Sequence, residues 1–226
     1  NIDLLLNENC FTITTAHQPN IFTGHLYFVF KILHAVKLAA SLKEQLPAYN
    51  FVPVYYMGSE DADLEELGTV SIDGKTYSWQ TTQTGAVGRM KIDKAFMQII
   101  EGIEAQLVVE PFGAEILEMV KKAYSLGRTI EQATLQFVHE LFGSYGLIIL
   151  LPDHPMLKAA FENITTRELQ EQFSSKAVEH TVEAFPEIYK VQAAGRDINL
   201  FYLKDDQRER IELNEDKWVV LNSNIT

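Results

Sequence analysis

Two short polar stretches follow the first two apolar runs of the chain and hold most of the residues suited to chemistry. Residues 15–27 read TAHQPNIFTGHLY, and residues 58–66 read GSEDADLEE. The first stretch combines imidazoles, amides and hydroxyls with a glycine, which suits the binding of a phosphate or carboxylate. The second is rich in carboxylates, which can bind an ammonium group, act as a general base or hold Mg²⁺ through water.

The flanking sequence predicts the elements that position both stretches. Residues 10–15 are apolar and β-branched and predict a buried strand, and residues 51–57 predict a second one. Thr23 has the type of a helix N-cap, which predicts a largely buried helix from there to about residue 45. A strand, helix and strand in this order predict a parallel pair. Both polar stretches would then lie at the carboxyl edge of the sheet, where α/β proteins bind ligands, and we expect them to converge on one pocket.

Each stretch also has a purely structural interpretation. Thr23 could serve only as a helix cap, the Pro19-Asn20 pair only as a turn, and Lys31 could face solvent. The acidic residues could simply favour a helix N-terminus, although Glu60 and Asp61 lie nearest the strand end. His17 and His25 are eight residues apart, a spacing that fits no recognised metal site.

The rest of the chain predicts an α/β core with an insertion and a β-rich tail. Asp73-Gly74 predicts a hairpin turn between residues 70–72 and 76–80. Thr129 and Gln132 predict a capping box, with a helix stop at Gly143. Further helices are expected at 93–107, 113–126, 129–142 and, broken, at 153–183, and further strands at 146–151, 189–192, 199–203, 211–213 and 217–221.

Composition narrows the classes of protein. The 226 residues carry a formal net charge of −12, which argues against nucleic-acid binding. No apolar stretch is long enough for a membrane span. Cys10 is the single cysteine, which fits a reducing compartment and an inert, buried side chain. The chain starts at Asn1 without a signal peptide or an initiating Met, so we expect it to be cut from a longer protein.

The two polar stretches resemble motifs of a known enzyme family. Residues 15–18 and 22–27 with Lys31 are similar to the opening motif of the bacillithiol biosynthesis cysteine-adding enzymes, which reads Thr-Gly-Gln-Gln, then Thr-Gly-Pro-Leu-Tyr and a downstream Lys. Residues 59–63 resemble the family's Gly-Glu-Asp-His-Asp segment. Similarity continues at residues 87–89, 141–147, 153–155 and 199–201 and at Arg208 and Arg210. The chain departs from the pattern at Ala16, His17, His25 and Ala62, where Gly, Gln, Pro and His are usual.

The resemblance implies a Rossmann-like core related to nucleotidyltransferases and class I aminoacyl-tRNA synthetases. We expect residues 1–68 to form the first part of this core, 69–128 an insertion of a hairpin and helices, 129–185 the rest of the core, and 186–226 a β-rich connecting segment. The implied activity is a ligase that joins cysteine to the amino group of glucosaminyl-malate. ATP or a related nucleotide is the expected cofactor, with Mg²⁺ as a candidate metal, in a cytoplasmic homodimer held by a C-terminal coiled coil that lies outside this chain.

The expected site follows from these motifs. We expect catalysis by His17, Glu60, Asp61 and Asp63, and substrate or nucleotide binding by Gln18, Asn20, Thr23, Gly24, His25, Tyr27, Lys31 and Ser59. No protein metal ligands are expected. Two other functions stay open: a ligand-binding fragment without catalysis, and a nucleotidyltransferase-like enzyme that acts on another small substrate.

Overall fold

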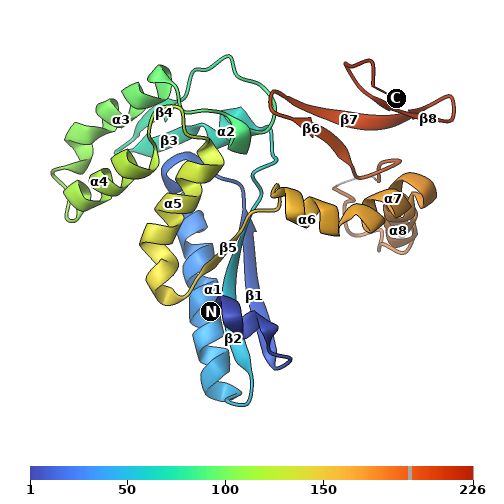
Figure 1. Ribbon diagram of the computed structural model, residues 1–226, viewed down its shortest axis with the longest axis horizontal. Helices are drawn as coiled ribbons and strands as arrows, with labels where there is room; N and C mark the ends of the chain where they lie inside the picture. Colours follow the sequence, from blue (N-terminus) through green and yellow to red (C-terminus); the bar gives the residue numbers. More distant parts are fainter. Residues whose placement is uncertain (193–194, 226) are drawn as a thin grey trace. The chain divides into compact units, whose positions relative to one another are not determined.

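The computed structural model describes residues 1–192 and 195–225 and divides into two compact units (Figure 1). The first unit is Asn1–Pro152 and the second is Asp153–Thr226, and most contacts lie within one unit or the other. The division therefore falls inside the range 129–185 that was expected to continue the core.

The first unit is built on a three-stranded parallel sheet. Its strands are β1 (Cys10–His17), β2 (Asn50–Met57) and β5 (Ile148–Leu150), in the order β1-β2-β5. Helix α1 (Leu26–Gln45) connects β1 to β2, so the predicted parallel unit is confirmed. His17 is paired with Met57 in the register, and the two strands therefore end level with each other.

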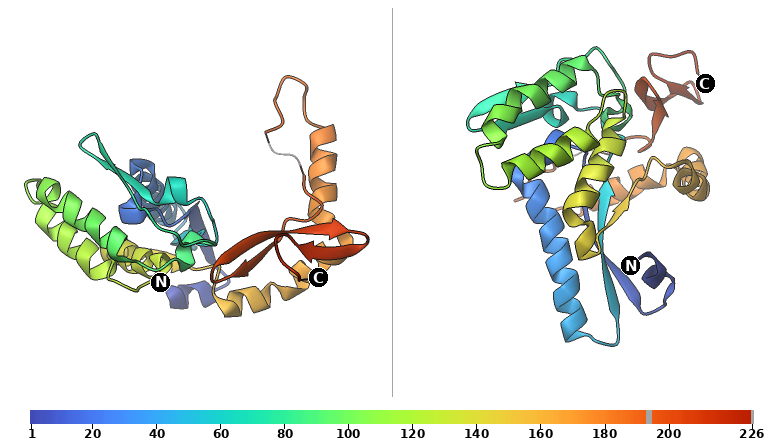
Figure 2. Two further views of the ribbon diagram at one scale, coloured as in Figure 1. Left: turned by 90° about the horizontal axis from the view of Figure 1, so that it is seen from above. Right: turned by 60° about the vertical axis from the view of Figure 1, so that its left-hand side comes forward.

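Two helices cover one face of this sheet. Phe28 and Ile32 of α1 and Val138 of α5 (Ile130–Phe142) pack with Tyr55 and Met57 of β2 in one buried cluster. In Figure 2 these helices are the light blue and yellow ribbons beside the strands. The cluster holds the helix start and the strand ends in fixed positions.

Three expectations about this region were wrong. Helix α1 begins at Leu26 with His25 as its N-cap, whereas Thr23 closes a short 3-10 helix, η2 (Ile21–Thr23), with a positive φ of 69°. The helix buries only the face that meets the sheet, and Leu26 and Phe30 are 68% and 62% exposed. Strand β1 lies at the edge of the three-stranded sheet and is not buried, and Cys10 is half-buried.

Between β2 and α5, in the segment expected to be an insertion, the chain forms a hairpin and helices. The elements are α2 (Leu64–Leu67), β3 (Thr69–Ile72), β4 (Lys75–Ser78), η3 (Val87–Arg89), α3 (Lys94–Leu107) and α4 (Gly113–Ala123). The hairpin turns at Asp73 and Gly74, which both have positive φ, as a tight primed turn requires. The capping box of Thr129 and Gln132 at the start of α5 is also confirmed. After α5 the chain continues into η4 (Gly143–Tyr145), and the left-handed residue is Gly146 rather than Gly143.

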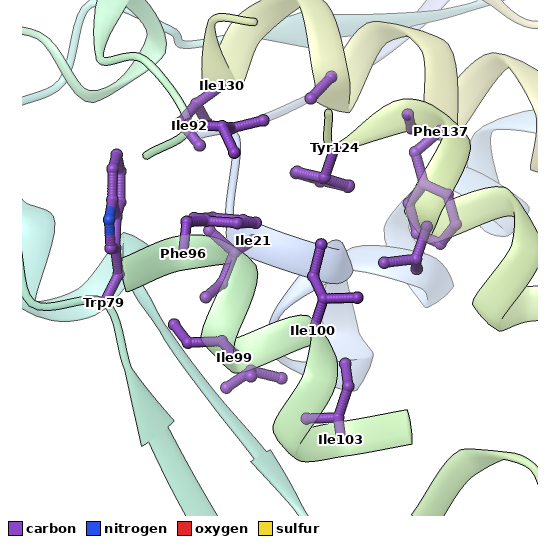
Figure 3. Close-up of a cluster of buried hydrophobic side chains, with 14 of the residues drawn as sticks. Ile21, Trp79, Ile92, Phe96, Ile99, Ile100, Ile103, Tyr124, Ile130 and Phe137 are labelled. Atoms are coloured by element: carbon purple, nitrogen blue, oxygen red, sulfur yellow. The ribbon is translucent and has the colours of Figure 1, made fainter. Parts of the chain in front are cut away.

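A second buried cluster joins the insertion to the loop after β1. Ile21 lies within it, and the rings of Phe96 and Tyr124 stack with centroids 5.5 Å apart (Figure 3). Burial raises the pKa of Tyr124 to about 12, and its hydroxyl accepts a hydrogen bond from the Phe22 backbone N–H. The insertion therefore packs against the loop after β1 and holds Ile21 and Phe22 in place.

Among its described residues, the second unit contains three short helices and an antiparallel sheet. The helices are α6 (Pro155–Ala160), α7 (Glu162–Glu171) and α8 (Phe173–Glu183), and the strands are β6 (Phe201–Lys204), β7 (Gln207–Asn214) and β8 (Lys217–Val220). The strand expected at residues 189–192 is absent, because no described strand pairs with that segment. Glu168 is buried and accepts hydrogen bonds from the backbone N–H groups of Ser174 and Asn199.

The remaining short element is η1 (Ile2–Leu6), which lies against β1 and β2. Within the described residues, no helix combines the length and the apolar character needed to cross a membrane.

Candidate functional site

The loops that follow β1 and β2 meet at the carboxyl edge of the parallel sheet. The Gly58 backbone N–H donates to the His17 carbonyl oxygen at 2.9 Å. The Gln18 side-chain amide donates to the Asp61 carboxylate at 3.1 Å. The stretches around residues 17–25 and 58–63 therefore converge, as their positions after neighbouring strands predict.

His17 connects the strand end to the start of α1. Its Nδ1 lies 3.0 Å from the Gln18 carbonyl oxygen and its Nε2 lies 3.1 Å from the Tyr27 hydroxyl oxygen. A carbonyl oxygen can only accept, so we assign the proton to Nδ1, and Nε2 then accepts from Tyr27. Partial burial lowers the pKa of His17, and the positive charge of Lys31 acts in the same direction. The ring is therefore neutral at neutral pH and available as a base.

The first turn of α1 places further polar groups beside His17. The His25 and Tyr27 rings stack with centroids 5.5 Å apart. His25 is the N-cap, yet its side chain makes no capping hydrogen bond. The N-terminus of a helix carries unpaired N–H groups and a partial positive charge, so this turn can attract an anion. Lys31 instead donates to the Ala16 carbonyl oxygen at 2.6 Å and ties α1 to the end of β1.

The three carboxylates after β2 have different surroundings. Asp61 accepts from Gln18 and from the Ala62 backbone N–H, and its side chain is half-buried. Asp63 is the N-cap of α2 and accepts from the Glu66 N–H at 3.3 Å. Glu60 is half-buried and lies between the strand end and Asp61. The geometry thus joins Asp61 directly to the first loop and gives Asp63 a structural contact.

Ser59 and Asn20, both expected to contact ligand, are fully buried. The Ser59 hydroxyl donates to the Glu131 carboxylate, in the first turn of α5. Ser59 also packs against Gly88, where a Cβ atom would lie 2.5 Å from the serine Cβ. Thr23 and Gly24 lie in the turn before α1, and both have positive φ.

Two supporting residues were missed by sequence reasoning. The Tyr55 hydroxyl donates to the His17 carbonyl oxygen at 3.1 Å and so holds the end of β1. Glu131 anchors Ser59. The period-two alternation of a strand places Tyr55 on the same face as Met57, which was a usable signal. Nothing in the local sequence connects Glu131 with a loop about seventy residues away.

The fold is a Rossmann-like domain, and its polar side chains gather at the carboxyl edge of the sheet, where such domains bind ligands. The family model described as "Bacillithiol biosynthesis BshC, N-terminal Rossmann-like domain" matches residues 1–226. The chain therefore belongs to the bacillithiol biosynthesis BshC family.

Curated relatives agree with this assignment. The chain is 40% identical over 226 residues to a protein of Flavobacterium johnsoniae and 38% identical over 227 residues to one of Cytophaga hutchinsonii, each named "Putative cysteine ligase BshC". Both comparisons cover 100% of this chain but only 42% and 41% of the relatives. A relative of the same name from Chlorobaculum tepidum is 31% identical over 93% of this chain. The chain thus spans about two fifths of the length of these relatives and matches a family of ligases in bacillithiol biosynthesis.

Proposed function

We propose that this chain is the N-terminal part of a ligase that joins cysteine to the amino group of glucosaminyl-malate. Family membership and the relatives' names support the class of reaction. The observation that carries the assignment of residues is the hydrogen bond from Gln18 to Asp61, which joins the two motif-bearing loops at one edge of the sheet.

The anionic part of the substrates binds at the start of α1 in this proposal. Thr23 and Gly24 form the turn before the helix, and the open N–H groups of its first turn face a carboxylate or phosphate. His25 and Tyr27 line the same turn through their stacked rings. The negative charge of the whole chain does not oppose this, because a helix N-terminus acts locally.

The carboxylates bind the attacking amine. Asp61 and Glu60 accept hydrogen bonds from its ammonium form and help to remove a proton, so that the free amine can attack the activated carboxyl group. Asp63 is a positioning residue, because its bond to the Glu66 N–H fixes the end of the loop. His17 acts through Tyr27, whose hydroxyl it orients because Nε2 accepts a hydrogen bond from that hydroxyl.

ATP, or a related nucleotide, supplies the activation of the cysteine carboxyl group. We further propose that Mg²⁺ enters with the nucleotide and is coordinated by phosphates and water. The protein is proposed to work in the cytoplasm as a homodimer, held by a coiled coil formed by residues outside this chain.

Substitution of the two central side chains in the full-length enzyme tests the proposal. Asp61→Asn should reduce ligation of cysteine to glucosaminyl-malate by about 100-fold or more, the scale of a lost acid–base group, and His17→Ala should reduce it by releasing the Tyr27 hydroxyl. Asp73→Asn is the matched control, because Asp73 lies in the exposed hairpin turn and asparagine also tolerates its positive φ.

The contrary results are specific. Ligation that is unchanged in both variants would contradict the assignment of the site. Pyrophosphate release that needs no amine would favour nucleotidyl transfer, and binding of cysteine and ATP without product would favour a binding role.

A further inference from the structure

Asn20 is the one residue in the described part of the chain whose buried side-chain amide lacks any hydrogen-bond partner. Its side chain is 0% exposed, and neither Nδ2 nor Oδ1 has a partner. Most buried polar groups in proteins are satisfied, and one left unsatisfied destabilises the fold. An amide in this position therefore calls for an explanation outside the free protein's own packing.

The loop around Asn20 is held in an unfavourable backbone conformation. Phe22, Thr23 and Gly24 have φ values of 51°, 69° and 52°, a region that residues other than glycine rarely adopt. Gly24 lies directly against the amide, since a Cβ atom at residue 24 would lie 2.8 Å from Asn20 Nδ2. Backbone strain of this kind gathers at ligand sites, where binding can release it.

Three backbone N–H groups hold the loop, and the bond from the Gly24 N–H to the Ile21 carbonyl oxygen, at 2.8 Å, must break for residues 23 and 24 to turn. Asn20 donates its backbone N–H to the Gln18 carbonyl oxygen, and the Phe22 N–H donates to the buried Tyr124 hydroxyl. Thr23 and Gly24 lie beyond the Phe22 bond and lead directly into the open first turn of α1. A change of the Gly24 backbone would uncover the amide at this turn, because glycine adopts both signs of φ at little cost.

We propose that Asn20 recognises a ligand group that pairs one hydrogen-bond donor with one acceptor, after residues 23 and 24 turn to expose its amide. The proposal rests on the proposed function, because it uses the same site. Nδ2 donates and Oδ1 accepts, so the amide matches a group with both characters. The α-amino acid cysteine offers a carboxylate beside an ammonium group, and the adenine edge offers an acceptor beside an amino group.

The experiment compares Asn20→Leu with the wild type in the full-length protein. Leucine has a similar size but no polar atoms, so the thermal midpoint of the ligand-free protein should stay the same or rise by a few degrees. Calorimetry with cysteine alone and with ATP alone should show an affinity at least 10-fold weaker for one of the two. Loss for cysteine alone identifies the amino acid as the ligand, and loss for ATP alone identifies the adenine edge.

Thr134→Val is the matched control for stability. Thr134 is also fully buried, but its hydroxyl lies 3.3 Å from the Tyr124 hydroxyl oxygen. Removal of a satisfied polar group should lower the midpoint by several degrees. Should Asn20→Leu not fold, Asn20→Ala removes the same amide without added bulk and must show the same selective loss of affinity.

Several outcomes would overturn the inference. A midpoint lowered by Asn20→Leu as much as by Thr134→Val would show that the amide is already satisfied, for instance by a buried water. Wild-type affinity for both ligands, with ligation intact, would remove Asn20 from recognition and leave the proposed function standing. Equal losses for both ligands would indicate a collapsed site, and a wild-type protein that binds neither would contradict the proposed function as well.

Discussion

The pair formed by His17 and Tyr27 makes the site sensitive to pH. Burial keeps the pKa of His17 below its usual value of 6.5, so the imidazole is neutral at neutral pH. We expect kcat/KM of the full-length enzyme to fall as the pH drops through this pKa, because a protonated Nε2 cannot accept from Tyr27. The unfolded chain binds this proton more readily, so acid below pH 6.5 also destabilises the folded state.

Tyr27→Phe should remove the acidic limb of that pH profile, because His17 then has no hydrogen bond from a tyrosine hydroxyl to lose on protonation. Tyr49→Phe is the control, because Tyr49 precedes β2 at the opposite end of the sheet. An acidic limb that persists in Tyr27→Phe would show that the limb does not arise from loss of the hydrogen bond between His17 and Tyr27.

Individual residues of the site were predictable only in part. The place of His17 and Asp61 followed from their position after neighbouring parallel strands. Thr23 was assigned as an N-cap because its residue type fits, but its positive φ takes the chain through a further turn before the helix. The sign of φ at Thr23 depends on how Ile21 and Phe22 pack in the buried cluster, and no local sequence pattern reveals that packing.

At the scale of elements, the Asp93 carboxylate joins the start of α3 to Trp79. It accepts from the Phe96 backbone N–H and from the Trp79 indole N–H, both at 2.9 Å. Asp93→Ala should lower the free energy of unfolding by about 3 kcal/mol, because it removes a helix cap and leaves a buried indole donor unpaired.

Thr129→Ala should lower the free energy of unfolding by only about 1 kcal/mol, because the Thr129 side chain caps its helix and makes no second contact like that of Asp93 with Trp79. Urea denaturation of both variants measures the difference. Equal losses would show that the Trp79 bond adds nothing to the cap.

In the second unit, Glu168 is a buried carboxylate that joins separate segments by hydrogen bonds, as Asp93 does in the first. Burial alone would raise its pKa, but hydrogen bonds from Ser174 and Asn199 outweigh burial and hold the pKa below the usual 4.5. The stabilisation is therefore complete above that pH and is lost as the pH falls through the lowered pKa. Glu168→Gln should lower the free energy of unfolding by about 2 kcal/mol at pH 7. It should also weaken the dependence of stability on acidic pH, because glutamine does not titrate.

Glu171→Gln is the control for Glu168, because Glu171 is exposed and pairs with Arg167 on the same helix. Exposed pairs contribute little, so its unfolding curve should match the wild type. If Glu171→Gln were the more destabilising change, the anchoring role of Glu168 would be wrong.

Strong local signals explain which elements were predictable. Asp73-Gly74 and the capping box specify their structures through a few neighbouring residues, and both are confirmed. The burial of α1 was overestimated because the helix is apolar on both sides, while only one side meets the sheet. Residues 189–192 have the composition of a strand, but no described strand pairs with them.

At the scale of the whole molecule, each unit contains one tryptophan. Trp79 lies in the buried cluster of the first unit, and Trp218 donates to the Leu169 carbonyl oxygen in the second. Fluorescence of Trp79→Phe and Trp218→Phe backgrounds therefore reports each unit separately. We expect Glu168→Gln to lower the midpoint seen by Trp218 and to leave that seen by Trp79 unchanged. A common shift would show that the two units unfold together.

Gly88 connects the insertion directly to residues 59–61, in the loop after β2 that carries the carboxylates. Its N–H donates to the Ser59 carbonyl oxygen, and the preceding Val87 N–H donates to that of Asp61 at 2.7 Å. There is no room for even a methyl group at residue 88. The positions of Ser59 and Asp61 at the sheet edge thus depend on η3, and drift in η3 during evolution would shift the carboxylates proposed to bind the amine without altering any of them.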